Sequence, residues 1–261
     1  MGKMPHIAID ESVRATAAIL PGDPARVNAI AALMDNPQEV AFNREYHSMV
    51  GTYKGRRILA ISTGMGGAST AICVEELADL GYRDLIRIGS CGALQEKLHL
   101  GELVICDRAV CDDGASQSYL HYLRYAGLEA DEGRGAWKDD EICYAYADRD
   151  LVAACEESAE EMGYDHQTGA TRSHDAIYLK KKGWLDSFYS SKGVYASDME
   201  TAALFAVAKE RGLRATSILN VVVEWQKNVK EGVGNYREGA NKAAKGEHNE
   251  IVTALEALAR C

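Results

Sequence analysis

Residues 58–92 read ILAISTGMGGASTAICVEELADLGYRDLIRIGSCG and predict the fold class of the chain. They predict a strand over Ile58–Ser62, a glycine turn, a helix over Ala68–Leu80 that ends before Gly81, and a second strand over Leu85–Ile88. Both strands are continuous apolar runs, which is typical of strands covered on both faces of a sheet. The stretch is therefore a strand–helix–strand unit, and it predicts an α/β fold.

The same alternation continues on both sides of this unit. Upstream, a predicted strand at Ala17–Leu20 ends at Pro21-Gly22, and Asp23 caps a helix that has Pro24 at its first position. Downstream, we expect strands at Leu103–Cys106, His166–Thr171 and Thr216–Val223 and helices at Leu151–Met162, Met199–Gly212 and Ala240–Arg260. Residues 112–148 show no clear period, and we expect a surface excursion there. Since no repeat or linker divides the 261 residues, we expect one domain over residues 1–261, a three-layer α/β/α sandwich with a central mixed β-sheet.

Charge and cysteine content exclude several classes of protein. The chain carries 29 Lys and Arg against 39 Asp and Glu, a net charge of −10, so it is a poor partner for nucleic acid or an anionic membrane. We find no apolar run long enough to span a membrane and no apolar segment typical of a signal peptide. The seven cysteines are scattered and form no Cys-x-x-Cys pair, which favours reduced thiols and a cytoplasmic location.

Three glycine turns follow predicted strands, at residues 21–26, 63–67 and 87–92. Ligands of open α/β sheets bind at strand ends, where glycines let backbone N–H groups approach an anion. Arg87 lies inside an apolar strand and Arg26 in the first turn of a helix, and guanidinium groups suit phosphate oxygens. The three turns predict a phosphate site, the alternative being ordinary turns with surface arginines. A dinucleotide fingerprint fails, because its third glycine would fall at Ser69.

Five segments stand in the order of one known family. They are Ile19–Arg26, Asn43–Tyr46, Ser62–Thr70, Arg87–Ala93 and Asp198–Ala203. On these segments the chain resembles the nucleoside phosphorylase family that contains uridine phosphorylase and hexameric purine nucleoside phosphorylase. The resemblance implies cleavage of the N-glycosidic bond of a ribonucleoside by inorganic phosphate, which gives the free base and ribose 1-phosphate.

The resemblance also implies which residues form the site. The family's phosphate-binding positions fall on Gly22, Arg26, Arg87 and Ser90, with Arg44 supplied by a neighbouring subunit. Its ribose-binding positions fall on Met199 and Glu200, with His6 supplied by the neighbour. Its base pocket falls on Cys91, Gly92, Tyr178 and Asp198, although the family usually has Glu at the last of these. The residues supplied by a neighbour imply a homo-oligomer, with a dimer as the minimum unit and a hexamer as the expected assembly. Inorganic phosphate is then a co-substrate, and we expect no metal or organic cofactor.

Base specificity is where the resemblance divides. The first half is most similar to uridine phosphorylase, yet the segment Ile177–Gly183 lacks the Gln and Arg with which those enzymes read uracil. The purine enzymes have an acid at the end of a late strand and an Arg thirteen residues later, and here Glu224 and Arg237 match as candidate catalytic residues. A Glu could protonate the purine if burial raised its pKa. The sequence therefore favours purine nucleosides. Uridine phosphorylase, a nucleosidase and a silent nucleoside-binding protein remain as alternatives.

Overall fold

A computed structural model describes residues 2–125, 142–180, 182–237 and 242–261. Its strands are β1 (Ala17–Pro21), β2 (Asp35–Asn43), β3 (Tyr46–Tyr53), β4 (Arg56–Ile61), β5 (Asp84–Ala93), β6 (Leu103–Asp112), β7 (Tyr144–Tyr146), β8 (His166–His174), β9 (Ala196–Asp198) and β10 (Arg214–Val223). Its helices are a short 3-10 turn η1 (Glu11–Val13), α1 (Pro24–Ala31), α2 (Gly67–Asp79), α3 (Gly114–Tyr125), α4 (Arg149–Met162), α5 (Lys182–Ser191), α6 (Thr201–Arg211), α7 (Val229–Arg237) and α8 (Lys242–Arg260).

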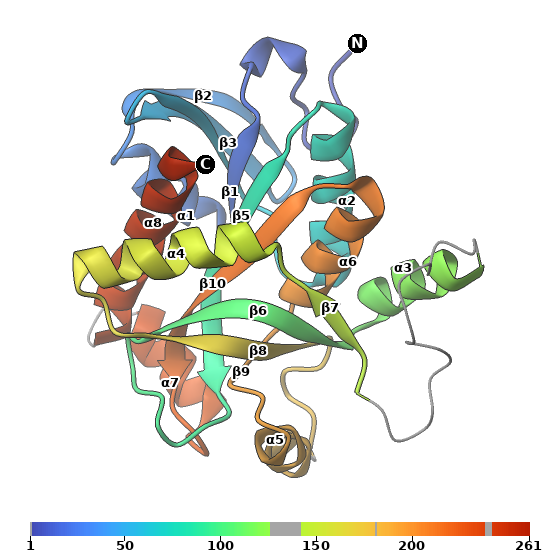
Figure 1. The fold of residues 1–261 in the computed structure, drawn as a ribbon, viewed down its shortest axis with the longest axis vertical. Helices are drawn as coiled ribbons and strands as arrows, with labels where there is room; N and C mark the ends of the chain where they lie inside the picture. Colours follow the sequence, from blue (N-terminus) through green and yellow to red (C-terminus); the bar gives the residue numbers. More distant parts are fainter. Residues whose placement is uncertain (1, 126–141, 181, 238–241) are drawn as a thin grey trace.

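All the described strands belong to one mixed sheet (Figure 1). Its order is β10-β6-β8-β9-β5-β1-β4-β3-β2, with β7 beside β6. β10 also pairs with β5, so five strands, β5, β9, β8, β6 and β10, close into a ring. This ring was not predicted from the sequence, since the ring depends on β9, a strand of only three residues.

Helices cover both faces of the sheet, as the three-layer prediction required. One face packs its apolar side chains against α2 and α6, and the other packs against α1, α4 and α8. β1, the last four residues of β4 and the first half of β5 are fully buried because both layers cover them. The predicted α/β fold is therefore confirmed, and the carboxyl ends of β1 and β5 meet at the same edge.

Local signals account for several element boundaries. The Asp23 side chain accepts a hydrogen bond from the N–H of Ala25 and caps α1 as expected. The helix predicted from Met199 instead begins at Thr201, because Asp198 ends a strand and Glu200 is the N-cap. The predicted terminal helix begins at Lys242, and Ala240 lies outside the described residues.

Two segments differ from expectation. Residues 35–53 form a hairpin, β2 and β3, that was not predicted, because β2 is mostly exposed and lacks an alternating apolar pattern. The expected excursion at 112–148 contains the helix α3 and the short strand β7, and residues 126–141 lie outside the described part.

Candidate functional site

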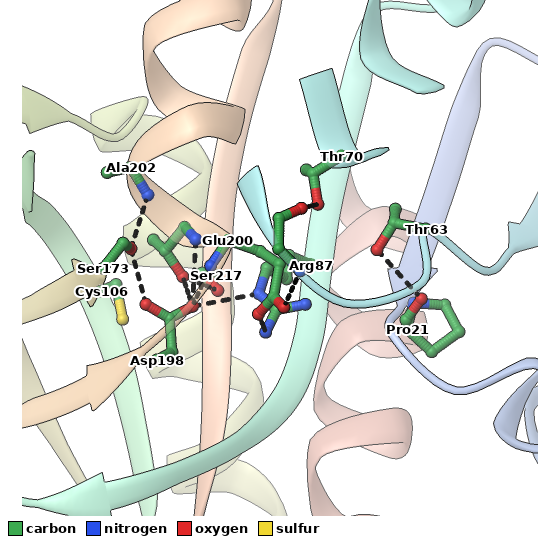
Figure 2. A network of polar contacts seen from close by, with 12 residues as sticks. Pro21, Thr63, Thr70, Arg87, Cys106, Ser173, Asp198, Glu200, Ala202 and Ser217 are labelled. Carbon is green, nitrogen blue, oxygen red and sulfur yellow. Dashed lines mark hydrogen bonds and ion pairs between the residues drawn. The ribbon is translucent and has the colours of Figure 1, made fainter. Parts of the chain in front are cut away.

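Arg87 is the centre of the site. It lies in β5, its side chain is buried, and its guanidinium folds back over Gly89. Nε donates to Asp198 Oδ2 at 3.2 Å and Nη2 to Glu200 Oε2 at 2.5 Å, so two carboxylates compensate the buried cation (Figure 2). Nη1 is buried and has no hydrogen-bond partner among the described residues. A buried cationic N–H without a partner favours an anion at this position.

Asp198 fixes these groups through a dense network (Figure 2). Its Oδ1 accepts from Ser173 Oγ at 2.7 Å, and its Oδ2 accepts from Thr201 Oγ1 at 2.6 Å. The N–H groups at the start of α6 also donate to Oδ2. Asp198 thus accepts from the first N–H groups of α6 and also from Arg87, so it connects the start of this helix to the buried guanidinium.

Arg26 is the second buried arginine and comes from α1. Its Nε donates to Glu247 Oε2 at 3.1 Å and its Nη2 to the Tyr236 hydroxyl at 2.6 Å. Its Nη1 lies 3.1 Å from Glu250 Oε1, and the Glu250 side chain is fully buried. The helices α7 and α8 therefore close over Arg26.

Tyr236, Glu247 and Glu250 were not predicted from the sequence as partners of Arg26. They lie more than two hundred residues downstream, and the chain around them reads as an ordinary amphipathic helix with solvated acids. The one available signal was the acid at position 250, which shares the apolar stripe of α8 with Ile251 and Leu255.

Burial changes the ionisation of the acids around both arginines. Burial raises the pKa of Glu250 to about 8, against the opposing effect of Arg26. Burial also raises the pKa of Glu200, although Arg87 lowers it. Burial alone would lower the pKa of Arg26, but Glu250, Tyr236 and Glu247 raise it above its usual value. The arginines stay charged, while Glu250 and Glu200 take up protons more easily than usual.

Glycines make room for this arrangement. A Cβ at Gly89 would lie 2.7 Å from Arg87 Nη2, and a Cβ at Gly22 would lie 3.1 Å from the carbonyl oxygen of Gly64. The first two glycine turns therefore abut each other, and the third supports the buried guanidinium. Gly66, with a φ of 96°, donates its N–H to Glu200 Oε1 at 2.7 Å. This bond ties the turn after β4 to the start of α6.

Four of the predicted phosphate residues gather at this edge. Gly22 follows β1, and β1 pairs with β5 in parallel up to Pro21 and Ile88. Ser90 follows Gly89 on β5 and is exposed, unlike the residues before it. The structure thus brings Gly22, Arg26, Arg87 and Ser90 together around the ends of β1 and β5.

His6 lies in the N-terminal segment and Arg44 in the turn between β2 and β3. His6 Nδ1 lies 2.6 Å from Glu76 Oε1, and Asn43 Nδ2 donates to the carbonyl of His6. Arg44 is exposed and has a φ of 54°. Both Arg44 and His6 interact electrostatically with Glu45. Among the described residues, no hydrogen bond or ion pair joins His6 or Arg44 to any of the four phosphate residues.

The base side of the site is more open. Glu224 directly follows β10, whose Val223 pairs with Gly92, and its Oε1 lies 3.7 Å from His99 Nδ1. Its side chain is 36% exposed, so Glu224 is only partly shielded from solvent. Arg237 ends α7, and its side chain lies outside the described part of the chain. Tyr178 is exposed, with Lys230 Nζ over its ring.

The remaining predicted residues flank the network. Cys91 is buried on β5 and Gly92 follows it, while Met199 is half-buried between Asp198 and Glu200. The described residues include no group of three or more His, Cys, Asp or Glu side chains that could hold a metal ion. Within the same residues, no helix is long and apolar enough to cross a membrane.

Comparison with known proteins decides the family. Residues 16–254 match the model of the phosphorylase superfamily, and this span contains both buried arginines and the acidic network. The chain belongs to the phosphorylase superfamily. A guanosine phosphorylase from Halorubrum lacusprofundi is 33% identical over 99% of both chains. A purine nucleoside phosphorylase from Plasmodium vivax is 32% identical over 83% of this chain and 81% of its own.

The solved structures agree with this membership. A uridine phosphorylase from Vibrio fischeri ES114 superposes with a TM-score of 0.85 at 37% identity, over 100% of this chain and 99% of that one. The expected nucleoside phosphorylase family and its fold are therefore confirmed, and this protein is an enzyme of the pentosyltransferase class. The named relatives differ in the base they act on, so membership leaves the base open.

Proposed function

We propose that this phosphorylase cleaves purine ribonucleosides with inorganic phosphate. The observation that carries the proposal is Arg87, a buried guanidinium with an unpaired Nη1 beside the exposed Ser90. A water nucleophile needs no such cation, whereas a phosphate oxygen accepts from it directly. Arg26, Gly22 and the Ser90 hydroxyl complete the phosphate site.

The reaction depends on placing an anion against the sugar. A phosphate oxygen attacks C1′ of the ribose as the bond from C1′ to the base nitrogen breaks, and the bonding electrons leave with the base. The developing positive charge on the sugar is stabilised by the phosphate and by the carboxylate of Glu200. Glu200 accepts from Gly66 and Arg87, which orients it toward the ribose hydroxyls, and Met199 packs against the sugar.

Two observations support a purine base. Segment 177–183 has no Gln or Arg with which to read uracil, and the guanosine phosphorylase of Halorubrum aligns with almost the whole chain. In this proposal Cys91, Gly92 and Tyr178 line the base pocket. Glu224 donates a proton to the departing purine, and Arg237 assists it.

Assembly and location follow from the same proposal. Arg44 and His6 reach a neighbour's phosphate and ribose, so the minimum working unit is a homodimer, and a hexamer is three such dimers. The His6 backbone is anchored by Glu76, which accepts its N–H, so this segment is held rigidly enough to serve a neighbour. Scattered free cysteines agree with a reducing cytoplasm.

The test is turnover of guanosine, inosine, adenosine and uridine, each with and without phosphate. We expect phosphate-dependent release of guanine or hypoxanthine at least tenfold faster than release of uracil. Uridine is the second candidate, because the Vibrio uridine phosphorylase matches the chain over its full length. A preference for uridine would replace the purine assignment, and turnover unaffected by phosphate would indicate a nucleosidase.

A further inference from the structure

His174 is a buried histidine that has no role in the site described above. It is the last residue of β8, and only 4% of it is exposed. Its Nδ1 is buried without a hydrogen-bond partner among the described residues. Burial, with Arg172 and Lys182 nearby, lowers its pKa to about 4, so the ring is neutral at pH 7. Leaving such a nitrogen unpaired destabilises the fold, so a ligand is the expected partner.

The strand register brings His174 to the candidate site. The short strand β9 lies between β5 and β8. One row across these strands consists of the paired residues Gly92, Ser197 and Arg172. Continued by one residue past the end of β9 at Asp198, the same register would place Ser90, Met199 and His174 in one row. The histidine therefore ends its strand beside two residues of the candidate site.

Side-chain alternation gives these three residues a common face. Ser173 and Asp198 form a pair across β8 and β9, and their side chains are hydrogen-bonded on one face (Figure 2). His174 is the next residue of β8 and Met199 directly follows the end of β9, and the alternation continued by this one residue places both on the opposite face. Ser90 is exposed and Met199 half-exposed, so this face is open to a ligand.

The spacing along this row matches the three parts of the reaction. Neighbouring strands lie about 4.8 Å apart, so His174 is about 10 Å from Ser90 across the sheet. Phosphate belongs at Ser90 and ribose at Met199, which leaves the third part of the substrate, the base, for His174. We propose that His174 hydrogen-bonds the nucleobase and helps determine base specificity; this inference rests on the proposed function.

The chemistry of a neutral imidazole fits this role. One ring nitrogen donates and the other accepts, and Nδ1 is the nitrogen left unpaired. A purine presents N7 and, in guanine or hypoxanthine, O6 as acceptors. Negative charge builds on the base as it departs, so a donor from Nδ1 bonds more strongly in the transition state. The charged groups that face the ring are Arg172, Lys182, Asp186 and Asp198, and burial outweighs the two acids.

The experiment compares H174L, which removes both ring nitrogens, with H174N, which keeps a polar group near the position of Nδ1. The control is H166L at the opposite end of the same strand, where Nδ1 contacts the carbonyl of Tyr164. We expect H174L to lower kcat/KM for the preferred nucleoside at least tenfold while the KM for phosphate changes less than twofold. H174N should recover most of the loss, and H166L should behave as the wild type.

Calorimetry with free guanine and free uracil separates this inference from the proposed function. If the wild type shows no phosphate-dependent turnover, the proposed function fails, yet loss of base binding in H174L still supports the contact. Kinetics of H174L within twofold of the wild type, or an equal loss for phosphate and nucleoside, would overturn it. Should H174L fail to fold, H174A with added imidazole replaces it: restored turnover supports the contact, and none contradicts it.

Discussion

If Arg26 binds phosphate as proposed, Glu250 competes with that anion for Arg26, and replacing Glu250 by Gln tests this competition. The Glu250 side chain is fully buried on α8, and its Oε1 lies 3.1 Å from Arg26 Nη1. Glu247 from the same helix, and Arg87 and the backbone of Gly89 from β5, also face it. Across 3.1 Å, two unit charges attract by about 5 kcal/mol at an effective dielectric constant of about 20. Ionised Glu250 therefore holds Arg26 away from an incoming anion.

The size of the effect follows from the pKa of Glu250. With a pKa of about 8, about 90% of Glu250 carries its proton at pH 7 and about 10% at pH 9. If phosphate binds only the protonated form, its apparent dissociation constant rises in proportion to the loss of that form. The wild-type KM for phosphate should then increase about tenfold from pH 7 to pH 9.

The assay is the KM for phosphate at saturating nucleoside, measured across this pH range for the wild type and E250Q. Phosphate's own ionisation is common to both enzymes and cancels in their ratio. We expect the KM of E250Q for phosphate to lack the tenfold rise of the wild type. The KM of E256Q, a change on the same helix beside Tyr53 and Lys54, should rise as in the wild type. Parallel wild-type and E250Q profiles would refute the competition between Glu250 and phosphate.

The same group gives a stability prediction with a definite sign. The folded pKa of Glu250 lies above the usual value of 4.5, so the folded state binds a proton that the unfolded state has lost. Its contribution to the free energy of unfolding therefore declines as pH rises from about 4.5 to about 8. E250Q should unfold at a higher urea concentration than the wild type at pH 8, and the difference should vanish near pH 4.

Three further changes test the rest of the site. R87A leaves two buried carboxylates unpaired and should lower the free energy of unfolding, measured in urea, by about 3–5 kcal/mol. The control R108A, at a half-exposed arginine, should lower it by less than about 1 kcal/mol. Equal losses in the two variants would contradict the stabilising role of the Arg87 network. G89A places a Cβ 2.7 Å from the guanidinium and should raise the KM for phosphate several-fold, whereas G183A, with open space around it, should not. E224Q should reduce kcat for purine nucleosides by about 100-fold or more, and full activity would remove Glu224 as the general acid.

The sequence predicted those parts of the fold that local patterns determine. The apolar runs at Ile58–Ser62 and Leu85–Ile88 became buried strands, and Asp23 capped α1, because periodicity and capping act within a few residues. The hairpin at 35–53 was not predicted, because an exposed strand needs no apolar alternation and is stabilised by its partner strand. Strand β9 was not predicted, because three residues are too few to show the alternating pattern of a strand.

The site divides in the same way. Arg87 could be predicted, since a cation inside an apolar strand is costly without an anion. Its compensating acid Glu200 came from the family resemblance, and the acids around Arg26 came only from the structure. Glu250 meets Arg26 across more than two hundred residues, and no local pattern records that contact. His174 likewise became visible only through the register of β8 against β9.

In the proposed reaction two buried arginines, Arg26 and Arg87, hold phosphate as the nucleophile. The most direct measurement follows guanosine consumption by the wild-type enzyme with and without inorganic phosphate, and identifies the sugar product. We expect no appreciable turnover without phosphate, and ribose 1-phosphate as the product when phosphate is present. Free ribose, formed at a rate independent of phosphate, would contradict it.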